Sequence, residues 1–173
     1  MNHPRGSSPG GLPKLQLVHA DHAPALLAFE QENRSYFAAS VPDRGDAYFA
    51  EFAERHRELL AWQAAGTDFF HVLVEEDGTI VGRVNLTHIA DGAADLGYRI
   101  AERAAGRGLA TAAVRQVCAL AVTQYGLSVL NAAARVDNLG SRTVLSRTGF
   151  VPTGDIVLSG RPGIRYRLDL PRR

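Results

Sequence analysis

The chain has 173 residues, 46% of them hydrophobic and 21% charged, which is typical of one globular domain with its own core. Lys and Arg number 19 and Asp and Glu number 18, a balance that argues against nucleic acid or an anionic membrane as a partner. Cys118 is the only cysteine, which excludes an internal disulfide, and no stretch approaches the roughly 18 consecutive apolar residues of a membrane span.

Residues 1–13 are polar and rich in Gly, Pro and Ser, without the hydrophobic segment of a signal peptide. We interpret them as a disordered lead-in to a single domain over residues 14–173, and we expect a cytoplasmic protein. Cys118 lies in an apolar helical pattern, where a small buried residue is expected rather than a nucleophile.

The first half of the domain is predicted to begin with one strand and two helices. Apolar residues alternate over residues 15–19, which predicts a strand, and a helix follows from the N-cap candidate Asp21 to about Asn33. Residues 35–46 are expected to form a loop. A second helix is predicted over about residues 46–65, with Gly66 as its end.

From residue 69 the hydrophobic period changes from 3.6 to 2, which predicts an antiparallel meander of three strands. Its strands are residues 69–75, 79–89 and 93–101, with turns at residues 76–78 and 91–92. The elements expected after it are a helix, a strand, a short helix and two strands joined by a turn at 159–163: residues 108–125, 130–136, 139–148, 150–158 and 164–170. This order predicts an α+β fold with a mixed, mostly antiparallel sheet of about seven strands and about four helices.

Residues 103–111, between a predicted strand and a predicted helix, carry the clearest chemical signal. Gly106 and Gly108 allow a tight turn and leave the backbone N–H groups unshielded, and the free N–H groups of a helix start bind anions. Arg103 and Arg107 add positive charge, and Thr111 adds a hydroxyl. This combination is suited to a pyrophosphate site, but on this segment alone an ordinary glycine loop with solvent-facing arginines stays open as the alternative. Neither a Walker loop nor a dinucleotide fingerprint fits the spacing.

Four short patterns occur around this segment in a fixed order: Gly97-Tyr98, Arg103-x-x-Gly106-x-Gly108, Asn138-x-x-Ser141 and Gly149-Phe150. With them, residues 12–171 resemble the Gcn-type N-acetyltransferase (GNAT) superfamily, and most closely its RimJ/RimL branch of ribosomal-protein N-terminal acetyltransferases. The resemblance implies the GNAT fold, with a sheet splayed at its centre. It also implies an enzyme that transfers an acetyl group from acetyl-CoA directly to a primary amine, without a metal.

The resemblance further implies which residues bind acetyl-CoA. The strand before the loop would pair with the pantetheine arm through its backbone, the amides of residues 104–110 would hold the pyrophosphate, and Asn138 would hydrogen-bond the arm. The expected cofactor-binding residues are Tyr98, Ile100, Ala101, Arg103, Ala104, Gly106, Arg107, Gly108, Leu109, Ala110, Thr111, Asn138 and Ser141.

Two residues are expected to be catalytic on the same grounds. Ser141 would donate a proton to the leaving thiolate, the alternative being that its hydroxyl caps the short helix. Asp95 would be the general base, against the alternative of an exposed Asp beside a turn. His88 is a further titratable candidate, although a lone histidine on a strand is more often structural. Some members of the branch use a cysteine where this chain has Ala134, which argues against a mechanism that depends on a cysteine there.

In this family the acceptor is chosen by two segments, here residues 31–46 and 156–164. The first carries an aromatic and polar mix that either lines an acceptor groove or anchors the loop: Asn33, Arg34, Tyr36 and Phe37. Glu30 and Glu32 border the acceptor side in relatives and could bind a substrate ammonium. Protein N-terminal amines are the expected acceptors, with small-molecule or antibiotic amines, or a non-catalytic acyl-CoA sensor, as alternatives. Modification of aminoacyl-tRNA is disfavoured by too few basic residues. We expect a monomer or a homodimer.

Overall fold

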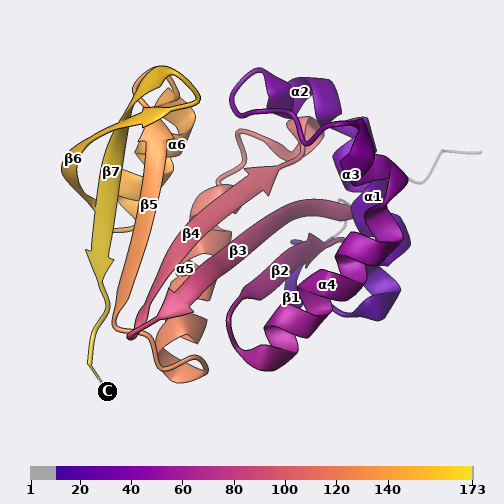
Figure 1. Ribbon diagram of the computed structural model, residues 1–173, viewed down its shortest axis with the longest axis horizontal. Coiled ribbons are helices and arrows are strands. Elements are labelled where there is room, and N and C mark those ends of the chain that lie inside the picture. Colours follow the sequence, from indigo (N-terminus) through magenta and orange to yellow (C-terminus); the bar gives the residue numbers. More distant parts are fainter. Residues whose placement is uncertain (1–10, 173) are drawn as a thin grey trace, which may run out of the picture.

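The computed structural model describes residues 11–172, so residues 1–10 of the expected lead-in lie outside the described residues. A seven-stranded sheet with the order β1-β2-β3-β4-β5-β7-β6 forms the centre (Figure 1). All neighbouring strands are antiparallel except β4 and β5. The strands are β1 (Lys14–Leu17), β2 (Phe69–Val74), β3 (Ile80–Ala90), β4 (Ala93–Ile100), β5 (Val129–Arg135), β6 (Val151–Leu158) and β7 (Arg161–Asp169). The predicted α+β class and mixed sheet are confirmed.

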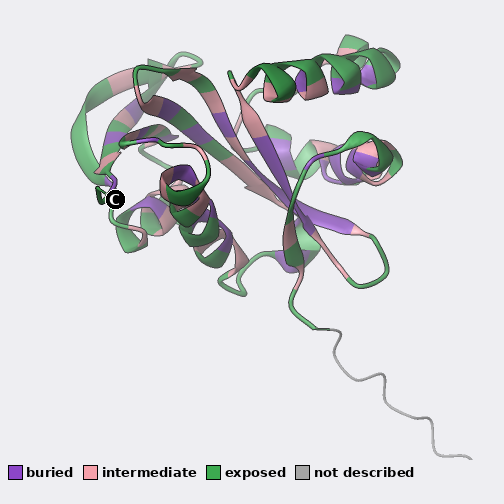
Figure 2. Ribbon diagram, turned by 90° about the horizontal axis from the view of Figure 1, so that it is seen from below, coloured by how far each residue is buried: buried purple, intermediate pink, exposed green. Residues whose placement is uncertain are grey.

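Helices cover both faces of this sheet. The α-helices are α1 (Ala23–Glu32), α2 (Arg34–Ala38), α3 (Asp46–Ala50), α4 (Phe52–Ala65), α5 (Leu109–Thr123) and α6 (Leu139–Arg147), and two short 3₁₀ turns are η1 (Ala20–His22) and η2 (Glu102–Ala104). Helices α1 and α4 lie on one face, and α5 and α6 lie on the other (Figures 1 and 2). No helix within residues 11–172 has the length and apolarity needed to cross a membrane.

The helical region before β2 differs from the prediction in three places. His19, not Asp21, caps the first turn, because its Nδ1 accepts a hydrogen bond from the Asp21 N–H at 3.2 Å. The expected loop contains α2, because Phe37 is buried against Phe29 and this burial stabilises a short helix that would not form alone. The expected long helix is broken at Glu51, so that two helices, α3 and α4, replace one.

The last hairpin is longer than predicted. Ser159 and Gly160 both have positive φ, 50° and 76°, as in a two-residue turn that matches the twist of the flanking strands. Arg161, Pro162 and Gly163 therefore belong to β7 and not to the turn, and Arg161 pairs with Leu158.

The core lies between the sheet and the helices on its two faces. Figure 2 shows buried residues along the inner strands and on the inward sides of the helices. Helix α5 buries one stripe against β3 and β4: Ala113, Val114, Val117 and Ala121. Cys118 is half-buried on the same helix, and burial raises the pKa of its thiol to about 11, so the thiol is not a nucleophile at neutral pH.

Strands β4 and β5 separate part-way along their length. They pair at only three positions, Ala93 with Val129, Ala94 with Leu130 and Asp95 with Asn131. Beyond these pairs β4 continues alongside β3, and β5 continues alongside β7, so the two strands diverge in a V (Figure 1). The predicted splayed centre of the sheet is confirmed.

Candidate active site

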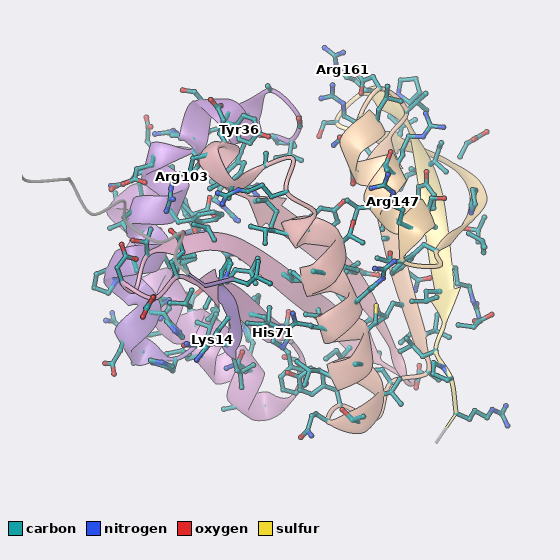
Figure 3. All side chains as sticks on the ribbon, turned by 180° about the vertical axis from the view of Figure 1, so that it is seen from behind. Lys14, Tyr36, His71, Arg103, Arg147 and Arg161 are labelled. Atoms are coloured by element: carbon teal, nitrogen blue, oxygen red, sulfur yellow. The ribbon has the colours of Figure 1, made fainter. Side chains whose placement is uncertain are left out.

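A cleft of about 1070 Å³ opens where β4 and β5 separate. Its floor is formed by residues 96–100 of β4 and 132–135 of β5, and its walls by residues 36–42, the loop before α5, the start of α6 and the β6–β7 turn. Figure 3 shows Tyr36 and Arg161 on opposite sides of the opening. The cleft therefore joins the two segments expected to choose the acceptor with the glycine loop.

The glycine loop forms one end of the cleft. Gly106 and Gly108 have φ values of 77° and 73°, a left-handed conformation that favours glycine, and a Cβ on either would meet no atom within 4 Å. Gly108 is the N-cap of the 15-residue helix α5 and makes no side-chain cap, which leaves the first N–H groups of the helix available. The N–H groups of Ala104 and Ala105 instead donate to carbonyl oxygens of Ala101 and Glu102. The donors available to an anion therefore begin at Gly106.

Ten of the predicted cofactor-binding residues line the cleft: Tyr98, Ile100, Ala104, Gly106, Gly108, Leu109, Ala110, Thr111, Asn138 and Ser141. Three others do not. Ala101 is buried beneath the loop, Arg103 forms an ion pair with Glu75, and the Arg107 guanidinium donates to the Arg103 carbonyl oxygen at 3.0 Å. The structure thus places the backbone of the motif at the cleft and both of its arginine side chains outside it.

Tyr98 and Ser141 meet across the cleft, from β4 and α6. Their hydroxyl oxygens are 2.9 Å apart, and the Tyr98 hydroxyl is also 3.3 Å from the Ser141 carbonyl oxygen. The N-cap of α6 is Asn138, whose Oδ1 accepts from the Ser141 N–H at 3.2 Å. Asn138 therefore caps α6, a role that had been the alternative for the Ser141 hydroxyl. The Ser141 hydroxyl contacts Tyr98 instead. Burial raises the pKa of Tyr98 against the opposing effect of its hydrogen bond with Ser141, so Tyr98 carries its proton at neutral pH.

Asp95 and His88 are not brought to Ser141. Asp95 lies where β4 and β5 are still paired, is exposed, and its carboxylate is 3.2 Å from Nδ1 of His88. His88 is exposed at an irregularity of β3 and has a positive φ of 53°. Neither residue lines the cleft, so the geometry does not support Asp95 as the general base.

The charged side chains that line the cleft are all arginines: Arg99, Arg135, Arg147 and Arg161. Among the described residues that line the cleft there is no Asp or Glu. Sequence reasoning had not selected any of these arginines. Successive side chains of a strand point to opposite faces of the sheet. Because Arg99 directly follows Tyr98 on β4, this alternation could have predicted that Arg99 lies on the face opposite to Tyr98.

Glu30, expected as a possible ammonium ligand, is instead held by three arginines. Its carboxylate is 1% exposed and accepts a forked hydrogen bond from Arg44, at 2.9 and 3.0 Å, and one from Arg83 at 2.9 Å. Arg99 adds a longer contact of 3.4 Å. Burial alone would raise the Glu30 pKa, but the Arg44 hydrogen bond and the charges of Arg83, Arg44 and Arg99 outweigh it, and the pKa is lowered. A substrate ammonium therefore finds no free carboxylate at Glu30.

Replacement of Glu30 by Gln is expected to lower the free energy of unfolding at pH 7 by about 3–5 kcal/mol, because it leaves the buried guanidinium group of Arg83 and the partly buried ones of Arg44 and Arg99 without their anion. The folded-state pKa of Glu30 lies below its ordinary value of 4.5, so this stabilisation is complete above about pH 4.5 and is lost as the pH falls through the folded-state pKa. Urea unfolding at several pH values measures the difference. The exposed Glu32→Gln is the control, with an expected change within about 0.5 kcal/mol. Equal effects of the two variants would contradict the role of Glu30.

Comparison with known proteins identifies relatives of the chain. Residues 14–151 match the model of the acetyltransferase (GNAT) domain family. The probable N-acetyltransferase YjcK of Bacillus subtilis is 31% identical over 134 residues, which are 74% of each protein. The ribosomal-protein-S5-alanine acetyltransferase of Vibrio fischeri superposes with a TM-score of 0.85 at 23% identity, covering 90% of this chain and 92% of that one. Mycobacterium smegmatis RimJ, solved in complex with CoA-disulfide, gives a TM-score of 0.81 at 22% identity, covering 92% and 86%.

Proposed function

Since this chain belongs to the acetyltransferase (GNAT) family and is therefore an acetyl-CoA-dependent N-acetyltransferase, we propose that its acceptor is the α-amino group of a protein or peptide N-terminus. The observation that carries the proposal is the charge of the cleft. Its lining has four arginines and no carboxylate among the described residues. The neighbouring carboxylates of Asp137 and Glu30 are already held by arginines, so an acceptor ammonium ion finds no free carboxylate there.

The attacking amine has to be neutral, and amine classes differ in how easily they lose their proton. At pH 8 about half of the α-amino groups are neutral, because their pKa is about 7.7–8.0, whereas only about 0.4% of lysine side chains are, at a pKa of about 10.4. Positive charges nearby lower an amine pKa further. A cleft without a carboxylate base therefore favours α-amines, and it disfavours lysines and polyamines with several ammonium groups.

The residues at the other end of the cleft fit acetyl-CoA. In this proposal the N–H groups that begin at Gly106, together with the start of α5, hold the pyrophosphate. The side of β4 that faces β5 beyond Asp95 has no partner strand within residues 11–172, which leaves its backbone groups available to the pantetheine arm. Arg147 adds a positive charge to the wall, as a ligand with several phosphates requires.

The Tyr98–Ser141 pair supplies the proton for the leaving group. The amine nitrogen forms a bond to the thioester carbonyl carbon, the carbon–sulfur bond breaks with its electron pair going to sulfur, and the Ser141 hydroxyl gives its proton to that sulfur. Tyr98, 2.9 Å away, reprotonates Ser141, the amine releases its own proton to water, and water returns a proton to Tyr98. Asp95 is not needed in this scheme.

The test compares two forms of one peptide, with acetyl-CoA as the donor and mass spectrometry as the readout. The first form has a free N-terminus and no lysine, and the second has a blocked N-terminus and one lysine. We expect acetylation of the first form, with kcat/KM rising through about pH 8 as the α-amine loses its proton, and less than about 1% of that rate with the second. Preference for the lysine form or for spermidine would overturn the proposal.

A further inference from the structure

The cleft borders a partly buried cluster of one carboxylate and three guanidinium groups, and the cluster has an excess of positive charge. Arg83 and Arg99 are register partners on β3 and β4, so they extend side by side toward α1, where Glu30 contacts both. Arg44 contacts the same carboxylate from the loop after α2. One negative charge therefore faces three positive charges in a region where Glu30 and Arg83 are almost completely buried.

Arg99 is the member of this cluster that lines the cleft and has donors to spare. Within residues 11–172 only its Nη1 has a hydrogen-bond partner, the Glu30 carboxylate at 3.4 Å, and its guanidinium lies 5.0 Å from the centre of the Phe37 ring. Its side chain is 19% exposed. Burial and then the charge of Arg44 lower the Arg99 pKa to about 10, against the opposing effect of the Glu30 charge.

Arg99 lies next to Tyr98 in the chain, which places its positive charge near the reacting atoms. Arg99 follows Tyr98 on β4 and extends to the α1 face, whereas Tyr98 contacts Ser141 on the α6 face. Consecutive Cα atoms are about 3.8 Å apart, so a group bound by Arg99 lies within a few residues of an amine that reacts beside Ser141. Tyr36, Phe37 and the segment after them form the adjacent wall.

We propose that the unpaired donors of Arg99 bind a carboxylate of the acceptor, so that the enzyme selects N-termini with Asp or Glu among their first three residues. The inference rests on the proposed function and deepens it. A carboxylate fits because a guanidinium offers two parallel N–H groups to its two oxygens. The added negative charge also compensates part of the positive charge that Glu30 alone leaves in the cluster. Aminoacyl-tRNA fits less well, because Arg99 is a single recessed side chain and the chain as a whole has 19 basic and 18 acidic residues.

The experiment measures kcat/KM for pairs of peptides that differ only by Glu or Gln at position 1, 2 or 3. At one position at least, the parent enzyme is expected to prefer Glu by about tenfold or more, through KM rather than kcat. The Arg99→Gln variant is expected to reduce this preference to within about twofold, and Arg99→Lys to retain part of it. The control Arg167→Gln removes an exposed arginine of β7 outside the cleft and is expected to keep the full preference. An unchanged Kd for acetyl-CoA shows that each variant is folded.

The other possible results contradict either the role of Arg99 or the proposed function. Turnover of peptides with no preference between Glu and Gln, or with a preference that survives in Arg99→Gln, overturns the role of Arg99 and leaves the proposed function intact. Acetylation of free glutamate in place of any peptide keeps the role of Arg99 in binding a carboxylate but overturns the proposed function, because the acceptor is then not a peptide N-terminus. Acetylation of aminoacyl-tRNA, or no turnover of any α-amine, overturns the proposed function itself.

Discussion

Replacement of both Gly106 and Gly108 by Glu is expected to abolish acetyl-CoA binding in a calorimetric titration. The parent protein should bind with a micromolar Kd, and the double variant with a Kd at least about a thousandfold higher, beyond detection. Both positions have positive φ, which disfavours any residue with a Cβ, and their N–H groups are the first available donors before α5. Two carboxylates at that point would also repel the pyrophosphate.

A matched control separates this effect from general strain. Gly66 and Gly126 also have positive φ, 75° and 64°, with no atom within 4 Å of an added Cβ, and neither lines the cleft. Gly66→Glu with Gly126→Glu therefore introduces the same charge and the same backbone strain, and should bind acetyl-CoA like the parent. If neither double variant loses binding, the pyrophosphate does not lie on the glycine loop, and if both lose it, the loss comes from backbone strain and not from the site.

Replacement of Ser141 by Ala is expected to lower kcat by about 10²–10⁴-fold while changing the KM for acetyl-CoA by less than about threefold. The substitution removes the hydroxyl that faces Tyr98 at 2.9 Å and leaves the helix cap, because Asn138 accepts from the Ser141 backbone N–H. Steady-state kinetics with a peptide acceptor, together with thermal unfolding, measure the two parts of the prediction.

The control for this substitution lies on the same helix. Ser146 is exposed near the end of α6 and does not line the cleft, so Ser146→Ala should retain the parental kcat. Tyr98→Phe, which keeps the ring and removes only the hydroxyl that reprotonates Ser141, should lower kcat less than Ser141→Ala. A Ser141→Ala variant with parental kcat would falsify the assignment of Ser141 as the proton donor.

The sequence predicted the parts of this molecule that depend on local pattern. The hydrophobic period identified all seven strands. The expected turn at Asp91-Gly92 is formed by these two residues, both with positive φ, because two-residue hairpins require that backbone conformation. The glycine loop and the start of α6 were predicted for the same reason, since each is a short segment whose chemistry is carried by adjacent residues.

Contacts between distant segments could not be predicted in this way. Glu30 and Arg99 are 69 residues apart, and only the packing of α1 on β3, which pairs with β4, brings them together. The composition of residues 34–38 indicated a loop, but the burial of Phe37 makes this segment helical as α2. Arg103 matched a family pattern, yet its side chain pairs with Glu75, because a strand–loop motif fixes the backbone and leaves an exposed side chain free to find another partner.

The divergence of β4 from β5 gives the sheet two further edges in its interior. Edge strands with free N–H and C=O groups are the usual sites at which sheets recruit a second chain and aggregate. Here those edges lie inside a cleft walled by the α2 segment, α6 and the β6–β7 hairpin, so that a flat strand from another molecule meets walls on both sides. A cofactor arm or the end of a peptide chain can enter such a cleft, whereas the edge of another folded sheet meets its walls first. The geometry that opens the site thus also protects the chain from self-association at its own centre.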